Sequence, residues 1–416
     1  MPSHIVLSKI LCLKKTRVVG WSFTDDGLVL DVKPALRFGR CSGCFEKARR
    51  VYDTYAGRSW RHMDFGGMRV DLRCDVRRLD CRRCGVLVEA VPWAAHGSSF
   101  TYRFEDQVAF LAQQANRTAV SELMRIAWRT VGNVIERVTA RLGPRDLLTN
   151  LRRIGVDELS YRKHHEYITV VVDHDTGRIV WAHPGKNADT LMAFFDELGP
   201  ERCAALRNVT LDMGQAYIKA VREKAPNAEL VFDRFHVQRL AHDALDELRR
   251  AEVREAGKGT DAAAAIKHSR WALQKNPWNL EPLEREKLAS LQRTNKLLYR
   301  GYLLKESLAA ILDRRQVNVA RDKLVEWCRW AALSRLAPFA KVGRTIRAHL
   351  DGIVAYVATG LSNGRVEGLN GKARTITRRA YGFHHARSLI AMLFLCCSGL
   401  TLHPVRVFPA ADLLPR

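Results

Sequence analysis

The succession of strand-like and helix-like segments between residues 153 and 233 constrains the fold of this 416-residue chain more than any other feature. Apolar and β-branched runs predict five strands, at residues 153–159, 167–173, 178–182, 208–212 and 229–233. Helical spacing predicts two helices, at residues 187–198 and 215–224, with Asn187 or Asp189 near the first cap. The predicted order is therefore β-β-β-α-β-α-β.

This order limits the ways in which the strands can be arranged. A three-stranded meander followed by α/β units is the plan of the ribonuclease-H-like fold, in which the first and fourth strands are neighbours. Asp157 lies on the first strand, in RIGVDE (153–158), and Asp212 ends the fourth, in VTLDM (209–213). We therefore expect these two carboxylates to approach one another.

A third acid is predicted to join them from a distant helix. Glu367 lies in NGRVEGLN (363–370), where an Asn-Gly pair breaks the chain before an apolar helical stripe. Carboxylates that gather in a basic protein raise one another's proton affinity unless a cation lies between them. Divalent cations held by carboxylates serve phosphodiester cleavage, so this trio indicates a metal-dependent site.

Other acids at strand ends have a simpler interpretation. A single aspartate after a strand is most often a turn former or a helix cap, and we assign Asp173, Asp175 and Asp196 to that class. Glu158 is a further candidate, but its side chain is expected on the opposite face of the strand from Asp157, because strand side chains alternate.

Four of the ten cysteines form two CxxC pairs, Cys41/Cys44 and Cys81/Cys84. Two such knuckles can complete a tetrahedral Zn²⁺ site, and four protein ligands make it structural. The alternating segment 68–76 predicts a strand that leads into the second knuckle, so a zinc ribbon on a β-hairpin is expected. The alternatives are coincidental pairs or a redox pair, with Cys74 as a competing ligand.

Residues 105–141 have helical spacing and contain a tight turn at Ala127. Two short helices around such a turn are typical of a helix-turn-helix, with an ordinary helical hairpin as the alternative. The second helix begins with Arg129, Thr130 and Asn133, and Arg and Asn can each make bidentate contacts with purines. The nearby arginines 77, 78, 82 and 83 strengthen the prediction of a DNA-reading unit.

The formal net charge is +24, which favours a polyanionic partner: nucleic acid first and a membrane surface second. The start of the chain lacks the pattern of a secretory leader. The apolar stretch 389–402 is interrupted by Ser398 and Gly399 and is better interpreted as a buried helix than as a membrane span. We therefore expect a cytoplasmic protein with reduced thiols.

These motifs together resemble the bacterial insertion-sequence transposases of the DDE superfamily, specifically the ISL3 group. The resemblance covers nearly the whole chain. It rests on the two CxxC pairs, the helix-turn-helix, and the segments GVDE (155–158), LDM (211–213), DRFHV (233–237), SNGRVEGLN (362–370), KAR (372–374) and RRAYGF (378–383).

The resemblance implies a catalytic triad of Asp157, Asp212 and Glu367 that holds two Mg²⁺ (or Mn²⁺) ions. It also implies phosphate contacts by basic residues near Glu367, namely Arg365, Lys372, Arg374, Arg378 and Arg379. Asp233 and His236 form a DxxH pair for which an accessory role at the site and a structural cap are both open. The partners implied are the terminal inverted repeats of the element and target DNA, bound by a homodimer or larger assembly at the nucleoid.

Five segments follow from this interpretation of a multidomain α+β protein. They are a zinc-ribbon DNA-binding domain (1–100), a helix-turn-helix (101–150), the first part of a ribonuclease-H-like catalytic domain (151–236), an all-helical insertion (237–355), and a final catalytic helix with the C-terminal segment (356–416). The insertion contains Trp271, Trp278, Trp327 and Trp330, which we expect to anchor its core more than to stack on bases. A transposase-derived repressor and a repair nuclease are the competing functional classes.

Overall fold

The computed structural model describes residues 7, 11, 13, 15–36, 38–48, 50–162, 166–362, 364–380, 383 and 385–403. The chain divides into two compact units, which are described separately. Unit 1 consists of residues 1–144 and 391–416, and unit 2 of residues 145–390. The finer five-segment division remains a prediction.

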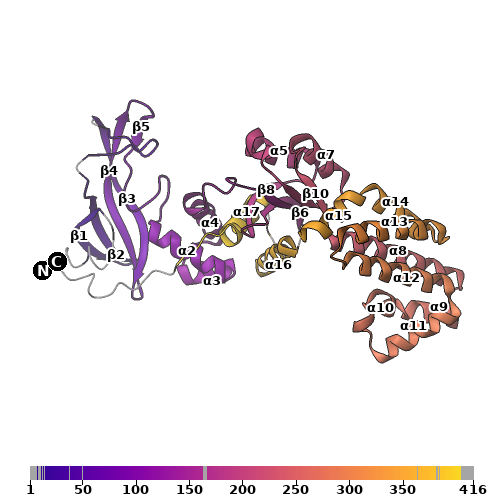
Figure 1. Cartoon of the computed structure of the whole chain (residues 1–416). Helices are drawn as coiled ribbons and strands as arrows, with labels where there is room; N and C mark the ends of the chain where they lie inside the picture. The colour runs from indigo at the N-terminus through magenta and orange to yellow at the C-terminus, as the bar shows by residue number, and fades with distance from the viewer. Residues whose placement is uncertain are drawn as a thin grey trace. The chain divides into compact units, whose positions relative to one another are not determined.

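Unit 1 begins with a five-stranded sheet (Figure 1). Its strands are β1 (Thr16–Thr24), β2 (Gly27–Pro34), β3 (Arg50–Phe65), β4 (Met68–Cys81) and β5 (Gly85–Val88), in the order β1-β2-β4-β3 with β5 on β4. The predicted strand before the second knuckle is confirmed as part of β4. One face of β4 is fully buried at Val70 and Leu72 and packs with Leu30 and Trp60, which explains the alternation in its sequence.

Three helices follow the sheet: α2 (Tyr102–Gln114), α3 (Arg117–Met124) and α4 (Trp128–Leu142). Asn116 caps α3 by accepting a hydrogen bond from the Ala119 N–H (2.8 Å), and Arg125 ends that helix in the left-handed conformation. The predicted turn before Trp128 is thus confirmed. Helix α17 (Ala386–Cys397) confirms the helix expected near the C-terminus. The side-chain amide of Gln113 in α2 donates a hydrogen bond to the Leu395 carbonyl of α17.

The sheet of unit 2 contains all five strands predicted from residue 153 onward. They are β6 (Arg153–Arg162), β7 (Glu166–Asp173), β8 (Arg178–Pro184), β9 (Asn208–Leu211) and β10 (Glu229–Phe232). The spatial order is β10-β9-β6-β7-β8. β6, β7 and β8 are antiparallel, while β6, β9 and β10 are parallel, so the first and fourth strands are neighbours as predicted.

Helices cover both faces of this sheet. Figure 1 shows α5 (Ala188–Leu198) and α7 (Gln215–Lys224) on one side and α16 (Gly364–Arg379) on the other. The short helix α6 (Pro200–Ala204) follows α5, which Asn187 caps as expected. Ile154, Val156, Val209 and Leu211 are buried in one core cluster with α5 and α7, so the alternate residues of β6 and β9 face the side of α16.

Helices between β10 and α16 form a stacked bundle. They are α8 (Arg234–Glu255), α9 (Asp261–His268), α10 (Arg270–Gln274), the 3₁₀ turn η1 (Pro277–Asn279), α11 (Pro282–Thr294), α12 (Lys296–Leu312), α13 (Val317–Leu333), α14 (Ala337–Ala348) and α15 (Leu350–Thr359). None of the helices in the described part of the chain is long and apolar enough to cross a membrane.

The tryptophans of this bundle correct one expectation. Trp327 is buried, and its indole N–H donates to the Leu304 carbonyl at 2.9 Å. Trp271, Trp278 and Trp330 are instead 61%, 70% and 38% exposed, so the prediction that they anchor the core was wrong. Trp271 and Trp278 lie on the short elements α10 and η1, which offer too little surface to enclose a large ring.

Candidate active site

Strand register brings the first two acids together. In the parallel pair β6–β9, Gly155 lies opposite Thr210, so continuing that register two residues places Asp157 opposite Asp212, just past the end of β9. Adjacent strands are roughly 5 Å apart. Both aspartates share the parity of Gly155 and Thr210, so they belong to the α16 face of the sheet.

Glycine at position 155 allows α16 to approach that face closely. A Cβ atom there would lie 2.6 Å from Cγ2 of Val366 and 2.9 Å from Nε2 of His174. Val366 is fully buried, and Glu367 follows it in the first turn of the helix with an exposed side chain. The contact between Gly155 and Val366 therefore brings the first turn of α16, with Glu367, onto the face that carries the two aspartates.

Hydrogen bonds hold both strand carboxylates. The Glu158 N–H donates to Oδ1 of Asp157 at 2.7 Å, and the side-chain amide of Asn370 donates to Oδ2 at 2.5 Å. The Gly214 N–H donates to Oδ1 of Asp212 at 2.9 Å. Both oxygens of Asp157 are thus already oriented by the protein.

Electrostatics show that the acids interact. Burial, with a contribution from Asp212, raises the pKa of Asp157 above its ordinary value. Burial also raises the pKa of Glu367, with further contributions from Asp233 and Asp157, while His236 acts in the opposite direction on both groups. Mutual repulsion of this kind is expected where carboxylates gather without a bound cation.

Glu158 lies on the other face, as the alternation along β6 predicts. Tyr217 of α7 donates a hydrogen bond to it and shares its own hydroxyl with Thr169 at 2.8 Å. Burial raises the pKa of Glu158 and outweighs this hydrogen bond. Glu158 is therefore held within the α7 side of the sheet and not beside Glu367.

The four CxxC cysteines are gathered far more tightly than the acids. Their sulfur atoms all lie within 4.8 Å of one another, and Sγ of Cys44 is 3.6 Å from Sγ of Cys81. Tetrahedral zinc with bonds of about 2.3 Å requires sulfur separations of roughly 3.8 Å. Within the described ranges no set of three or more acids is gathered to this degree.

Thiol ionisation at this cluster also suits a metal. Burial opposes ionisation of Cys41, but the backbone N–H groups of Cys44 and Gly43 outweigh it and lower the pKa of Cys41 to about 7. The Cys44 thiol and burial raise the pKa of Cys84 to about 12. Zinc binds the thiolate form of cysteine, so a zinc ion would displace the thiol protons of this cluster.

The predicted recognition helix presents its polar residues outward. Arg129 and Asn133 are exposed on the first turns of α4 and Thr130 is half-buried. On α16, Lys372, Arg374 and Arg378 are exposed and Arg379 is half-buried, whereas the side chain of Arg365 lies outside the described residues. These positions are accessible to a phosphate backbone.

The ribbon arginines are less available. Arg77 pairs with the buried carboxylate of Glu89 at 2.5 Å, and Arg78 pairs with Asp53. Arg83 lies 3.7 Å from a carboxylate oxygen of Glu46. Three of the four arginines that suggested a basic ribbon therefore have acidic partners, which a count of charges along the sequence does not reveal.

Asp233 and His236 lie at the start of α8, close to Glu367. Asp233 is almost fully buried at the N-cap position but makes no side-chain capping bond there. Both residues influence the pKa of Glu367. Asp233 and His236 therefore lie within electrostatic range of Glu367.

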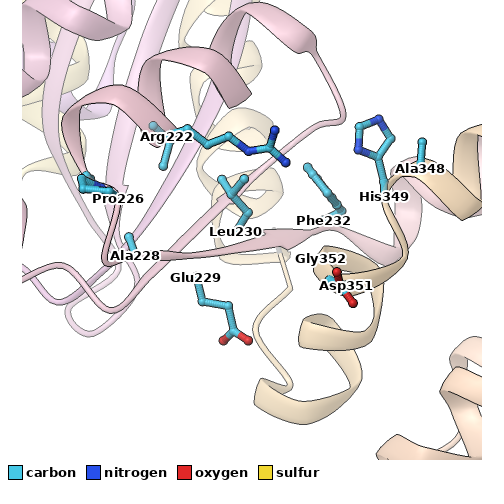
Figure 2. A pocket seen from close by; sticks show the side chains of 12 residues that line it. Arg222, Pro226, Ala228, Glu229, Leu230, Phe232, Ala348, His349, Asp351 and Gly352 are labelled. Carbon is cyan, nitrogen blue, oxygen red and sulfur yellow. The ribbon is translucent and has the colours of Figure 1, made fainter.

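A hollow of about 440 Å³ lies elsewhere in unit 2, between α7, β10 and α15. Figure 2 shows the Arg222 side chain extending toward His349, whose ring meets Phe232 edge-on. Asp351 and Glu229 also line the hollow, so its charge is mixed, and none of the three acids lines it. It is not part of the candidate site.

Three models of known protein families match the chain. A DDE-type transposase model of the ISL3 group matches residues 154–393, which is more than half of the chain. The chain belongs to the ISL3 family of insertion-sequence transposases. The helix-turn-helix domain of the same family matches residues 89–139, and the zinc finger of the IS204/IS1001/IS1096/IS1165 transposases matches residues 37–84.

Two relatives illustrate the range of the family. The chain is 42% identical to a transposase for insertion sequence element IS1557 of Mycobacterium tuberculosis, over 86% of each chain. It is 29% identical to a transposase for IS1001 of Bordetella parapertussis, over 86% of this chain and 89% of the relative. These matches confirm the expected family, its zinc ribbon and its DNA-binding helix-turn-helix.

Two residues of the site were not singled out by the sequence interpretation. Gly155 and Asn370 both lie inside the quoted motifs. Their roles depend on contacts between β6 and α16, whose contacting residues are more than 200 positions apart in the sequence. The available signal was a polar residue at an otherwise apolar helical position: Val366, Asn370 and Ala373 recur at spacings of four and three.

Proposed function

We propose that this ISL3-family transposase cleaves DNA at the ends of its element and joins them to a target, using Asp157, Asp212 and Glu367 as metal ligands. The observation that carries the proposal is the parallel pairing of β6 with β9 beneath α16, which directs all three acids to one face of one sheet. The strand order is that of the ribonuclease-H-like plan and supports assigning the domain to it.

The donor set fits hard divalent cations. All three groups are carboxylates, which Mg²⁺ and Mn²⁺ prefer, and their mutual repulsion is what a cation would relieve. Two such ions would supply an acidified water or 3′-hydroxyl as the nucleophile and stabilise the leaving oxygen. Since the nucleophile comes from water or DNA, no serine or tyrosine of the chain has to attack the phosphate.

The chain's own residues then bind and orient. The Glu158 N–H and the Asn370 amide hold the Asp157 carboxylate in one orientation. Lys372, Arg374, Arg378 and Arg379, together with Arg365, would neutralise scissile or target phosphates along α16. Asp233 and His236 would help to organise the acids or the flanking DNA.

Sequence recognition is assigned to unit 1. Arg129, Thr130 and Asn133 of α4 would contact base edges in the terminal inverted repeats, with the zinc ribbon supporting them. Two element ends must be joined, so we expect at least a dimer in the active complex. A protein of this kind is expected at the nucleoid, in the cytoplasm.

A gel assay with labelled element-end DNA and Mg²⁺ tests the proposal. We expect a shifted complex without metal and cleaved ends when metal is added. A transposase-derived repressor would give the complex without cleavage, and a repair nuclease would cleave without preference for the element ends. Either result would overturn the proposed function.

A further inference from the structure

Helix α16 buries a stripe of residues one helical face wide. Val366, Ala373 and Ile376 are 0%, 3% and 5% exposed, and Asn370 lies between them at 6%. Buried apolar side chains can slide along a sheet at little cost, whereas a buried amide has to find a hydrogen-bonding partner. Asn370 is therefore the member of this stripe that can fix the position of α16 along the sheet.

Its partner is one of the proposed metal ligands. The Asn370 side chain lies 2.5 Å from Oδ2 of Asp157. An ionised carboxylate only accepts hydrogen bonds, so the amide N–H must be the donor. The other oxygen, Oδ1, already accepts from the Glu158 N–H, so the amide removes the remaining freedom of the carboxylate to rotate.

The same contact determines the position of Glu367. Residues three apart lie on neighbouring turns of a helix, so Glu367 is one turn before Asn370. At the other end of this turn, Val366 contacts the surface that Gly155 leaves open. One apolar contact and one hydrogen bond thus set both the depth and the register of the helix that supplies the third acid.

We infer that Asn370 is a positioning residue of the acid site: its amide orients Asp157 and, through the register of α16, places Glu367. The inference rests on the proposed function of the three acids. Groups that orient metal ligands typically change metal affinity 10- to 100-fold when they are removed. The same hydrogen bond acts against burial, the main cause of the raised pKa of Asp157.

Asn370→Leu in the full chain is the decisive variant. Leucine has nearly the shape of asparagine and keeps the buried stripe apolar, but Oδ2 of Asp157 loses its donor, so we expect a folded protein with a modestly lower metal-free thermal stability. The apparent affinity for Mn²⁺, measured by calorimetry without DNA, should fall about tenfold or more. Cleavage of element ends should need correspondingly more Mn²⁺ and recover at high concentration.

Two further variants separate positioning from packing. Ile376→Val trims the same buried stripe without touching Asp157 and should leave Mn²⁺ affinity unchanged. Asn370→Ser, which keeps a hydroxyl too short to reach Asp157, should lower Mn²⁺ affinity as leucine does and takes its place if Asn370→Leu does not fold.

Wild-type Mn²⁺ affinity and cleavage in Asn370→Leu would overturn the inference. That failure is distinct from failure of the proposed function, in which the wild type would show no metal-dependent cleavage or Asp157→Ala would retain it.

Discussion

The cysteine cluster of unit 1 and the acid cluster of unit 2 are assembled in different ways. The four cysteines come from two knuckles that flank a single sheet, and their sulfur atoms already lie within 4.8 Å of one another. The acids come from two neighbouring strands and from a helix that begins about 150 residues later. Asp157 and Asp212 are aligned by strand pairing, but Glu367 depends on the docking of α16.

The charge of the side chains explains why the cysteines lie closer together than the acids. A thiol has an ordinary pKa of about 8.5, so thiols near pH 7 are largely neutral and can lie close together without strong repulsion. Carboxylates are ordinarily ionised at neutral pH and repel one another, and burial together with neighbouring acids raises the pKa of Asp157 and Glu367. The acid site therefore needs hydrogen-bond donors such as Asn370 and a cation to become compact.

The largest effect is expected from the acids themselves. Asp157→Ala, Asp212→Ala or Glu367→Ala should each reduce end cleavage at least about 1,000-fold, equivalent to roughly 4 kcal/mol of transition-state stabilisation, and leave end binding intact. Asp175→Ala is the matched control, because Asp175 lies in the turn between β7 and β8 of the same sheet and pairs with Arg153. Cleavage assays and gel shifts on the same preparations measure both properties, and full cleavage by any one variant removes that residue from the triad.

Loss of one zinc ligand should give the opposite phenotype. Cys81→Ser is expected to release zinc and weaken binding to element ends about 10- to 100-fold, since the ribbon loses its tetrahedral site. Mn²⁺ affinity of the acid site, measured by calorimetry, should not change. Cys74→Ser on the same strand is the control: burial raises the pKa of this thiol to about 11, and it lies outside the cluster. Unchanged end binding by Cys81→Ser would mean that the ribbon is not the reader.

A larger side chain at position 155 tests whether cleavage depends on the close packing of α16 against β6. Gly155→Ala should cost about 1–3 kcal/mol by overpacking against Val366 and lower cleavage roughly tenfold, with no effect on end binding. Val366→Ala in the same chain should restore the part of the loss that comes from contact with Val366, while the contact with Nε2 of His174 remains. Gly371→Ala, where a Cβ meets nothing within 4 Å, should instead stabilise α16 by roughly 0.5–1 kcal/mol. A fully active Gly155→Ala protein would contradict this role of docking.

The smallest effect concerns pH and unit 1. Burial, with the charge of Arg103, lowers the pKa of His62 to about 4 from an ordinary 6.5. Stability from a neutral His62 is present above pH 6.5 and is lost as pH falls toward 4, about 1 kcal/mol of it between pH 7.5 and 5.5. His62→Gln should flatten this dependence in thermal unfolding. An equal loss on acidification in the variant would assign the effect to other groups.

Local patterns in the sequence were sufficient for the strands of unit 2 and for the zinc site. Strand alternation predicted β6 to β10 and the faces on which Asp157 and Glu158 lie, and the CxxC spacing predicted four ligands in one cluster. These predictions were correct because alternation, helical periodicity and a tight knuckle involve residues that are close along the chain. The neighbouring positions of the first and fourth strands followed from the order of elements.

Only the tertiary structure decided how distant surfaces meet. Apolar periodicity identified the inner face of α16 but not that Gly155 admits Val366 or that Asn370 reaches Asp157. It also did not show that Trp271 and Trp278 remain exposed, or that ribbon arginines are paired with acids. A sequence fixes which face of an element is apolar, but the partner of that face depends on packing between segments that can be hundreds of residues apart.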